Sequence, residues 1–97
     1  MAPDLDLDKP YRLNPSVALR PEPFGALAYH FGNRKLSFLK APELVTFVRT
    51  LGEHASLGEA LDAGGLTDRT KQSYLRALAS LAATDMIVEK ERDDRDR

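Results

Sequence analysis

The chain has 97 residues, of which 42% are hydrophobic and 30% are charged, the composition of one globular domain. Fourteen Lys and Arg residues against fifteen Asp and Glu residues leave a formal net charge of −1, so the total gives no sign of a surface built for nucleic acid or anionic lipid. There is no cysteine, which excludes disulfides, thiolate zinc sites, thiol nucleophiles and ordinary cysteine-ligated iron–sulfur clusters.

The two ends of the chain differ from its middle. Residues 1–12 mix Asp and Pro with a few apolar positions, which predicts a flexible N-terminal arm. Residues 89–97 are almost all charged, with mixed sign, which predicts a solvated C-terminal tail. The folded domain is therefore expected to occupy residues 13–88. The first residues are acidic rather than signal-like, and no apolar run approaches the ~18 residues of a membrane span, so we expect a cytoplasmic protein.

The first half of the domain has the period of β-strands. Residues 17–20 alternate in a way that predicts one strand, before a Pro-Glu-Pro interruption. Leu27, Tyr29 and Phe31 then alternate with smaller or polar residues, so that one face of a second strand is large and apolar. We expect this large face to lie toward the core.

A hairpin turn follows the second strand. Gly32-Asn33 tolerates the positive φ angles of a tight turn, and Leu36 and Phe38 resume the alternation after it. Residues 36–40 are therefore predicted to form the third strand. Leu36 and Phe38, which share one face, are expected to be mostly core.

The second half of the chain has the period of helices. Pro42 suits the first turn of a helix, and the apolar stripe that follows it consists of Leu44, Phe47, Val48 and Leu51, at helical spacing. Ser56 and Glu59 have the spacing of a capping box, which predicts a short second helix through about residue 63.

A third helix is predicted to begin at Thr67 or Asp68 and to end near Asp85. Its apolar positions are Tyr74, Leu75, Leu78, Leu81 and Ala82. Residues 86–88 are expected to form a short strand or an extended segment. Because a three-stranded sheet this short is unstable with its apolar face uncovered, the helices must cover it. The predicted fold is α+β: a three-stranded antiparallel sheet followed by three helices, similar to a winged helix-turn-helix.

The residues that carry catalysis or bind metals are few. His30 and His54 are too poorly accompanied for a metal site, and we expect both at the surface or its rim. The serines lack a nucleophile turn, the carboxylates gather in the two tails, and the glycines lack the spacing of a phosphate loop. We therefore expect no enzyme activity, no cofactor and no metal.

Two binding functions remain open from the pattern alone. Residues 66–74 are similar to the recognition helix of a winged-helix DNA-binding regulator, in which Arg69, Lys71 and Gln72 would meet DNA. Alternatively, the third strand lies at the edge of the sheet and accepts an extended peptide as an added strand, with the third helix walling the groove.

A family resemblance separates these alternatives. Residues 11–27, YRLNPSVALRPEPFGAL, and residues 29–40, YHFGNRKLSFLK, closely resemble the mycofactocin biosynthesis chaperone (MftB) family, one of the PqqD-like RiPP recognition elements. The resemblance covers essentially the whole predicted domain, and its most specific block is RPEPFGAL at residues 20–27. It implies a non-catalytic chaperone that binds the leader of a ribosomally made precursor peptide. The chaperone presents that peptide to a radical S-adenosylmethionine (SAM) enzyme, which modifies a C-terminal Val-Tyr on the way to the redox cofactor mycofactocin.

The resemblance also implies where the leader binds, because family members hold it against the third strand and the third helix. In this chain the corresponding residues are Arg34, Lys35, Leu36, Ser37, Phe38, Leu39, Lys40, Lys71, Tyr74, Leu75 and Leu78. Arg34 and Lys71 are the expected partners of leader carboxylates. Replacement of Phe38 or Leu78 is expected to impair stability and binding together. Replacement of Leu39 or Lys71 is expected to weaken binding with little loss of stability.

Overall fold

The computed structural model describes residues 5–90 of the chain. The elements in chain order are β1 (Tyr11–Leu13), β2 (Val17–Glu22), β3 (Gly25–His30), β4 (Leu36–Leu39), α1 (Pro42–Thr50), a 3₁₀ turn (Leu51–Glu53), α2 (Leu57–Ala63), α3 (Asp68–Ala83) and β5 (Ile87–Glu89). Strands β2, β3 and β4 form an antiparallel sheet in that order, and β1 pairs with β5 in a second, two-stranded sheet. The predicted α+β class is confirmed, with three helices following a three-stranded sheet.

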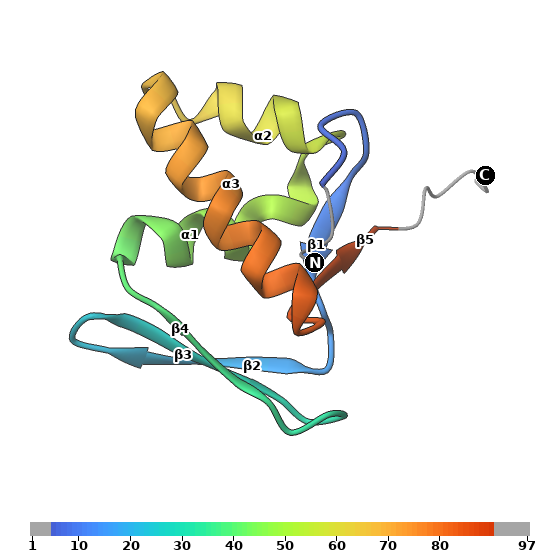
Figure 1. Ribbon diagram of the computed structural model, residues 1–97, viewed down its shortest axis with the longest axis vertical. Helices are drawn as coiled ribbons and strands as arrows, with labels where there is room; N and C mark the ends of the chain where they lie inside the picture. Colours follow the sequence, from blue (N-terminus) through green and yellow to red (C-terminus); the bar gives the residue numbers. More distant parts are fainter. Residues whose placement is uncertain (1–4, 91–97) are drawn as a thin grey trace.

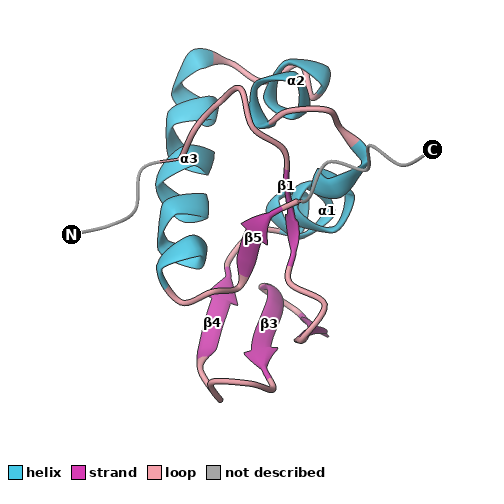
Figure 2. Cartoon of the chain, turned by 90° about the vertical axis from the view of Figure 1, so that its right-hand side faces the viewer, coloured by secondary structure: helices cyan, strands magenta, loops and turns pink. Residues whose placement is uncertain are grey.

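The helices cover one face of the three-stranded sheet. In Figure 1, α1, α2 and α3 all lie on the same side of β2, β3 and β4, with α2 farthest from the sheet. The pair β1–β5 lies beside α1 and the C-terminal end of α3 (Figures 1 and 2). No part of the chain within residues 5–90 covers the opposite face of the sheet, which we call the outer face.

Strand β3 points its small residues toward the helices. Ala26 and Ala28 are buried on the inner face, whereas Leu27 and Tyr29 are only partly buried and Phe31 is 62% exposed. The expectation that the large apolar face of this strand lies in the core is wrong. Alternation with period 2 defines two faces but not which of them turns inward. Beneath α1 and α3 the inner face of β3 therefore carries two alanines, and its one large buried side chain is that of His30, at the end of the strand.

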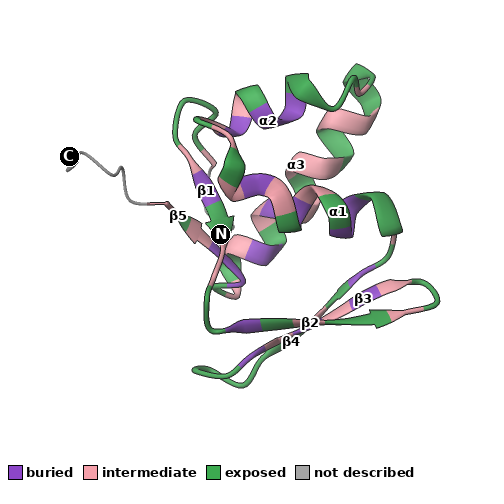
Figure 3. Ribbon diagram, turned by 180° about the vertical axis from the view of Figure 1, so that it is seen from behind, coloured by how far each residue is buried: buried purple, intermediate pink, exposed green. Residues whose placement is uncertain are grey.

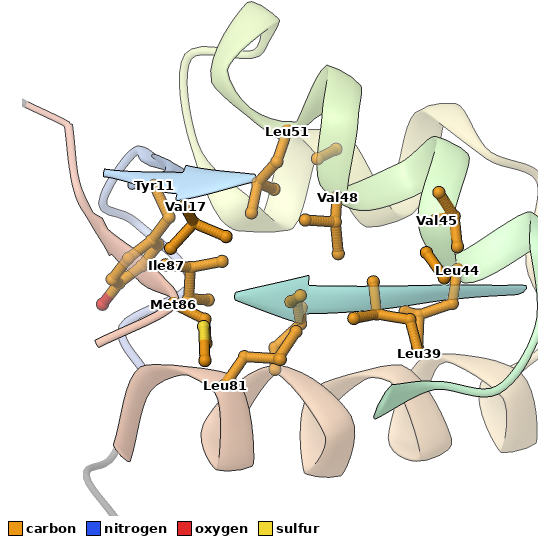
Figure 4. Packing of buried hydrophobic residues seen from close by; sticks show 14 of the residues in the cluster. Tyr11, Val17, Leu39, Leu44, Val45, Val48, Leu51, Leu81, Met86 and Ile87 are labelled. Carbon is orange, nitrogen blue, oxygen red and sulfur yellow. The ribbon is translucent and has the colours of Figure 1, made fainter. Parts of the chain in front are cut away.

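Strand β4 likewise turns the face opposite to the predicted one toward the core. Leu39 is 1% exposed and lies opposite Ala26, whereas Phe38 is 61% and Leu36 55% exposed on the outer face. Leu36 and Phe38 were expected to be core residues, and that expectation is wrong. Figure 4 shows Leu39 and Leu44 pointing toward one another beside β3.

The core joins the sheet to α1, α3 and the β1–β5 pair. Its largest fully buried side chains are Leu39, Leu51, Leu57, Leu78, Met86 and Val48. Leu78 and Leu81, two of the predicted apolar positions of the third helix, are buried. Figure 4 shows Leu81 near Met86 and Ile87, so the end of α3 is packed against the strand that follows it.

Two of the helices begin at the predicted caps. The Ser56 Oγ accepts the N–H of Glu59 at 3.1 Å, and the Glu59 carboxylate accepts the N–H of Ala55 at 2.8 Å. Thr67 caps α3 by accepting the N–H of Thr70 at 3.2 Å. These bonds satisfy donors that would otherwise have no partner in the first turn.

The residues assigned to the N-terminal arm contact the domain where the structure describes them. The carbonyl oxygens of Leu7 and Lys9 accept the N–H groups of Gly58 and Leu57 at 2.9 and 2.8 Å, at the start of α2. Tyr11, in β1, is buried. Residues 1–4 and 91–97, which include most of the predicted C-terminal tail, lie outside the described residues. The flexibility of residues 1–12 stays a prediction.

A buried histidine ties the turn of the β3–β4 hairpin to the end of α3. The His30 Nδ1 accepts the backbone N–H groups of Gly32 and Asn33 at 2.9 and 3.1 Å, so the ring hydrogen lies on Nε2. Nε2 then donates to the Asp85 Oδ2 at 3.1 Å, and that carboxylate also accepts from the Asn14 side chain at 3.2 Å. The expected surface position of His30 is wrong, because the residue is 5% exposed.

Further hydrogen bonds strengthen this connection, which we call the His30 cluster. The Asn33 side chain donates to the Thr84 carbonyl at 3.1 Å, and the Asn14 side chain donates to the Asp85 carbonyl at 2.9 Å. The cluster therefore joins three connections: β1–β2, β3–β4 and α3–β5. It fixes where the last turn of α3 stands relative to β4.

Gly25 meets a separate requirement for the position of β4. Its φ is +150°, a conformation that L side chains rarely adopt, and a Cβ there would collide with the Leu39 carbonyl oxygen. Glycine at this position lets the end of β4 and the start of the α1 connection pass close to β3.

We expect His30→Ala to lower the free energy of unfolding by about 1–3 kcal/mol, because two backbone donors and the Asp85 carboxylate lose their partner. His54→Ala is the matched control, since His54 is half-buried and makes no equivalent cluster. Urea denaturation of both variants measures the difference. Equal losses for the two variants would show that the His30 cluster does not hold the fold together.

We expect Gly25→Ala to destabilise the chain by about 2 kcal/mol or more, since strain and a backbone collision act together. Gly65→Ala serves as the control, because Gly65 also has a positive φ, +64°, but a Cβ there meets nothing within 4 Å. Thermal denaturation should therefore show a clearly larger loss for Gly25→Ala. A larger loss for the control would refute the close approach of β3 and β4.

Candidate peptide-binding groove

Strand β4 has an open edge. It pairs with β3 on one side, and no strand within residues 5–90 pairs with its other side. The His30 N–H donates to the Lys35 carbonyl, so the alternating antiparallel pattern directs the backbone groups of Ser37 and Leu39 toward β3. The N–H and C=O groups of Leu36 and Phe38 consequently point to the open edge, where they can pair with an added strand.

A groove runs between this edge and α3. Its volume is about 250 Å³, and it is lined by Ser37, Phe38, Leu39, Lys40, Leu44, Ala77, Ser80 and Leu81. Figure 2 shows the C-terminal half of α3 standing beside β4. Ser37, in the groove lining, has its Oγ 3.4 Å from the Oγ1 of Thr84, which follows α3.

The side of the groove that α3 supplies consists mostly of small residues. Ala77 and Ser80 carry short side chains, so α3 leaves room beside β4, while Leu81 and Leu44 form an apolar floor. A strand added to β4 would lie ~4.8 Å from it and would direct alternate side chains into the groove and onto the outer face. The arrangement therefore suits an extended peptide with an apolar residue at every second position.

The structure brings four of the predicted site residues to this groove, namely Ser37, Phe38, Leu39 and Lys40. Leu36 is exposed on the same edge strand, and Arg34 and Lys35 are exposed in the turn before it. Leu78 is fully buried in the core, and Leu75 is partly buried against it. These two residues pack α3 onto the core and do not line the groove.

Two predicted site residues lie elsewhere on α3. Tyr74 faces α1, with its ring 5.1 Å from that of Phe47, and lines a second hollow of about 790 Å³ among α1, α2 and α3. Burial and the nearby Glu43 carboxylate raise the pKa of Tyr74. The Lys71 Nζ binds the Asp62 Oδ1 at 2.9 Å, and this hydrogen bond and charge raise the pKa of Lys71. Lys71 is thus engaged with α2.

The sequence predicted Tyr74, Leu75 and Leu78 as the helix side of the peptide site, whereas the groove beside β4 is lined on that side by Ala77, Ser80 and Leu81. Ser80 and Leu81 follow Ala77 at three and four positions, so the three residues share a helix face, on which Ala77 and Ser80 are small. The prediction instead chose larger apolar residues of the same helix. Leu44 was identified in the sequence, but only as part of an apolar helix stripe.

The expected division between stability and binding is wrong for the two β4 residues. Phe38 does not reach the core, since 61% of it is exposed, and Leu39 is a core residue at 1% exposure. Leu39 lies on the inner face of β4, and Phe38 lies on the outer face.

Residues 5–90 contain no group of three or more His, Cys, Asp or Glu side chains placed to hold a metal ion. A helix long and apolar enough to cross a membrane is likewise not found in this part of the chain.

Comparison with known proteins identifies the family of this small α+β domain with its open strand edge. Residues 10–88 match the model of the Peptide chaperone MftB family. The chain is 49% identical over 88 residues to Peptide chaperone MftB of Mycobacterium ulcerans, covering 91% of this chain and 81% of the relative. The Mycobacterium tuberculosis protein of the same name is 47% identical over 85 residues, covering 88% of this chain and 78% of the relative. The Mycolicibacterium smegmatis protein of that name is 49% identical over 83 residues, covering 86% of this chain and 81% of the relative.

The chain therefore belongs to the Peptide chaperone MftB family, as its sequence blocks predicted. The name of the family describes a peptide chaperone, a non-catalytic role, which agrees with the expectation that the chain is not an enzyme. No solved structure matches the chain.

We expect Leu39→Ala to lower the free energy of unfolding by about 2–5 kcal/mol, because it opens a cavity between β3 and α1. Phe38→Ala should cost less than about 1 kcal/mol, because most of this side chain already meets solvent. Chemical denaturation of the two neighbouring variants under the same conditions measures both values. The reverse order would mean that β4 turns its other face inward.

Proposed function

We propose that this chain binds the leader of a ribosomally made precursor peptide as an added strand on β4. It presents that peptide to a radical SAM enzyme in the biosynthesis of mycofactocin. The observation that carries the proposal is the open edge of β4 beside the groove under α3. Strand addition needs both features, since the edge supplies backbone bonds and the groove selects side chains.

The edge offers enough interaction energy for useful affinity. Leu36 and Phe38 present about four backbone groups, each contributing ~1 kcal/mol when paired. One or two apolar leader side chains in the groove add about 1.5–3 kcal/mol each. After the cost of ordering the peptide, these contributions are consistent with a micromolar dissociation constant, on the order of 10⁻⁶ M.

The charges near the edge favour an acidic leader. Arg34 and Lys35 lie exposed in the turn before β4, and Lys40 follows the strand and lines the groove. Such exposed charges steer association more than they add affinity. Lys71 has no part in this proposal, because Asp62 already engages it.

The chemistry of the modification is left to the partner enzyme. This chain has no cysteine with which to hold an iron–sulfur cluster, so an adaptor function is consistent with its composition. We place this function in the cytoplasm, where the precursor is made. The DNA-binding alternative gains no support from α3, because Asp68 begins the helix and Lys71 is paired with Asp62.

Strand addition predicts a specific cost for removing one backbone donor. Phe38→Pro eliminates the outward N–H of Phe38 but leaves the bonds between β4 and β3, so leader affinity should fall about fivefold to tenfold below that of Phe38→Ala. Fluorescence anisotropy of a labelled cognate leader measures both variants, and the comparison with Phe38→Ala removes the effect of the lost ring. Equal affinities would refute backbone pairing at this edge.

The groove makes a second prediction that does not involve β4. Ser80→Arg places a long side chain over the groove from an exposed helix position, so leader binding should weaken at least tenfold while the melting temperature changes little. Ser73→Arg, also exposed on α3 but away from the groove, is the matched control and should bind normally. Normal binding by Ser80→Arg would move the leader elsewhere.

A further inference from the structure

The outer face of the three-stranded sheet carries a cluster of apolar side chains, of which only Phe38 also lines the leader-binding groove. Phe24, Phe31, Leu36 and Phe38 are 42%, 62%, 55% and 61% exposed. By the usual area of such side chains they expose roughly 400 Å², and contiguous apolar patches of that size are commonly interaction sites. Figures 1 and 3 show this face turned away from all three helices.

The patch is continuous across the sheet. Phe38 lies opposite Leu27, and Leu36 lies opposite Tyr29, so two cross-strand pairs form its centre. The Phe24 ring packs edge-on against Phe38 at 5.9 Å. The Tyr29 and Phe31 rings pack edge-on at 5.2 Å at the other end.

The surroundings of the patch are basic, although the whole chain carries a net charge of −1. Residues 17–40 contain four cationic side chains, Arg20, Arg34, Lys35 and Lys40, against one carboxylate, Glu22. Glu22 lies 3.1 Å from Arg20, whose side chain is 78% exposed in an outer-face position opposite Leu27. The sheet therefore has a charge of +3, and the rest of the chain has −4.

These features disfavour a second copy of the chain as the occupant. Two such patches face to face would bury roughly 800 Å², which is less than the ~1,000 Å² of a specific interface. The same symmetric pairing would also bring basic surfaces together, and like charges across an interface are unfavourable. An apolar patch with basic surroundings is instead complementary to an apolar surface with an acidic rim on a different protein.

Nucleic acid fits the patch less well than protein does. A sheet that binds bases presents the flat faces of its aromatic rings for stacking. Here the four rings are paired edge-on, at interplanar angles of 66° and 80°, and aliphatic Leu27 and Leu36 lie between them.

We propose that this outer face is the docking surface for the radical SAM enzyme, through an apolar enzyme surface with an acidic rim. The inference rests on the proposed function, since the enzyme is the protein to which the leader is presented. A leader strand on β4 would place every second side chain on this same face. The docked enzyme therefore contacts the chaperone and its bound leader together, and bound leader strengthens the docking.

The test uses the double variant Arg20→Glu/Phe31→Ser, whose two positions lie on the outer face and away from the groove lining. The matched control is Leu7→Ser/Arg69→Glu, which changes charge equally at exposed positions outside the three-stranded sheet. Biolayer interferometry measures affinity for the purified cognate enzyme, with and without saturating cognate leader. Fluorescence anisotropy measures leader affinity separately.

The expected result is at least a tenfold loss of enzyme affinity for Arg20→Glu/Phe31→Ser. Its leader affinity and melting temperature should stay near the wild-type values, and the control should bind both partners normally. Enzyme affinity within twofold of wild type, or no enzyme binding by the wild type, would overturn the docking surface while leaving leader binding intact. Loss of enzyme binding in the variant, with no leader binding by the wild type, would support the docking surface and refute the leader proposal.

Two other occupants give distinct outcomes. Sedimentation of a wild-type dimer that Arg20→Glu/Phe31→Ser dissociates would assign the face to a second copy. Salt-sensitive binding of a single-stranded oligonucleotide, lost in the same variant, would assign it to nucleic acid. Either outcome would overturn the proposal.

Discussion

The imidazole of His30 holds together the segments on which the groove depends. It accepts two N–H groups of the β3–β4 turn and donates to Asp85, directly after α3, while Asn14 completes the cluster from the β1–β2 connection. The distance between β4 and the last turns of α3 is therefore set by hydrogen bonds at one end and by Leu39 and Leu81 packing along the core. A hydrogen-bonded cluster around one buried histidine suits this role because its bonds are directional, whereas apolar packing alone tolerates sliding.

This constraint also explains why the sheet shows its large side chains to solvent. With α3 and α1 held close above the sheet, β3 contributes only Ala26, Ala28 and the His30 imidazole to the interior. The larger residues of β3 and β4 consequently lie outside, where they cost solubility and add little to the fold. Aromatic side chains kept in such a position are accounted for by an interaction, which is why we assign the outer face to a protein partner.

The sequence predicted the helices and the hairpin because these follow local signals. The caps at Ser56 and Thr67 and the change of period after Pro42 depend on residues only a few positions apart. The three-residue strand β1 was missed because its partner, β5, lies more than seventy residues away and such a short segment carries almost no pattern.

The candidate site was only partly predictable, for two physical reasons. Family resemblance located the edge strand. Period-2 alternation, however, does not say which face of the strand turns toward the core, and so does not say whether Phe38 or Leu39 is buried. The rotation of α3 is a tertiary property, so the sequence did not show that Ala77 and Ser80, rather than Tyr74, stand beside β4. Small residues carry little hydrophobic signal, yet they leave the space that a peptide needs.

The most direct test of the account is amide hydrogen exchange, read by NMR, for the four residues of β4 with and without cognate leader. The outward amides of Leu36 and Phe38 should exchange rapidly in the free chain and become strongly protected when leader binds. The amides of Ser37 and Leu39, which face β3, should be protected in both states. Leader-induced protection at other residues, with Leu36 and Phe38 unchanged, would contradict strand addition at this edge.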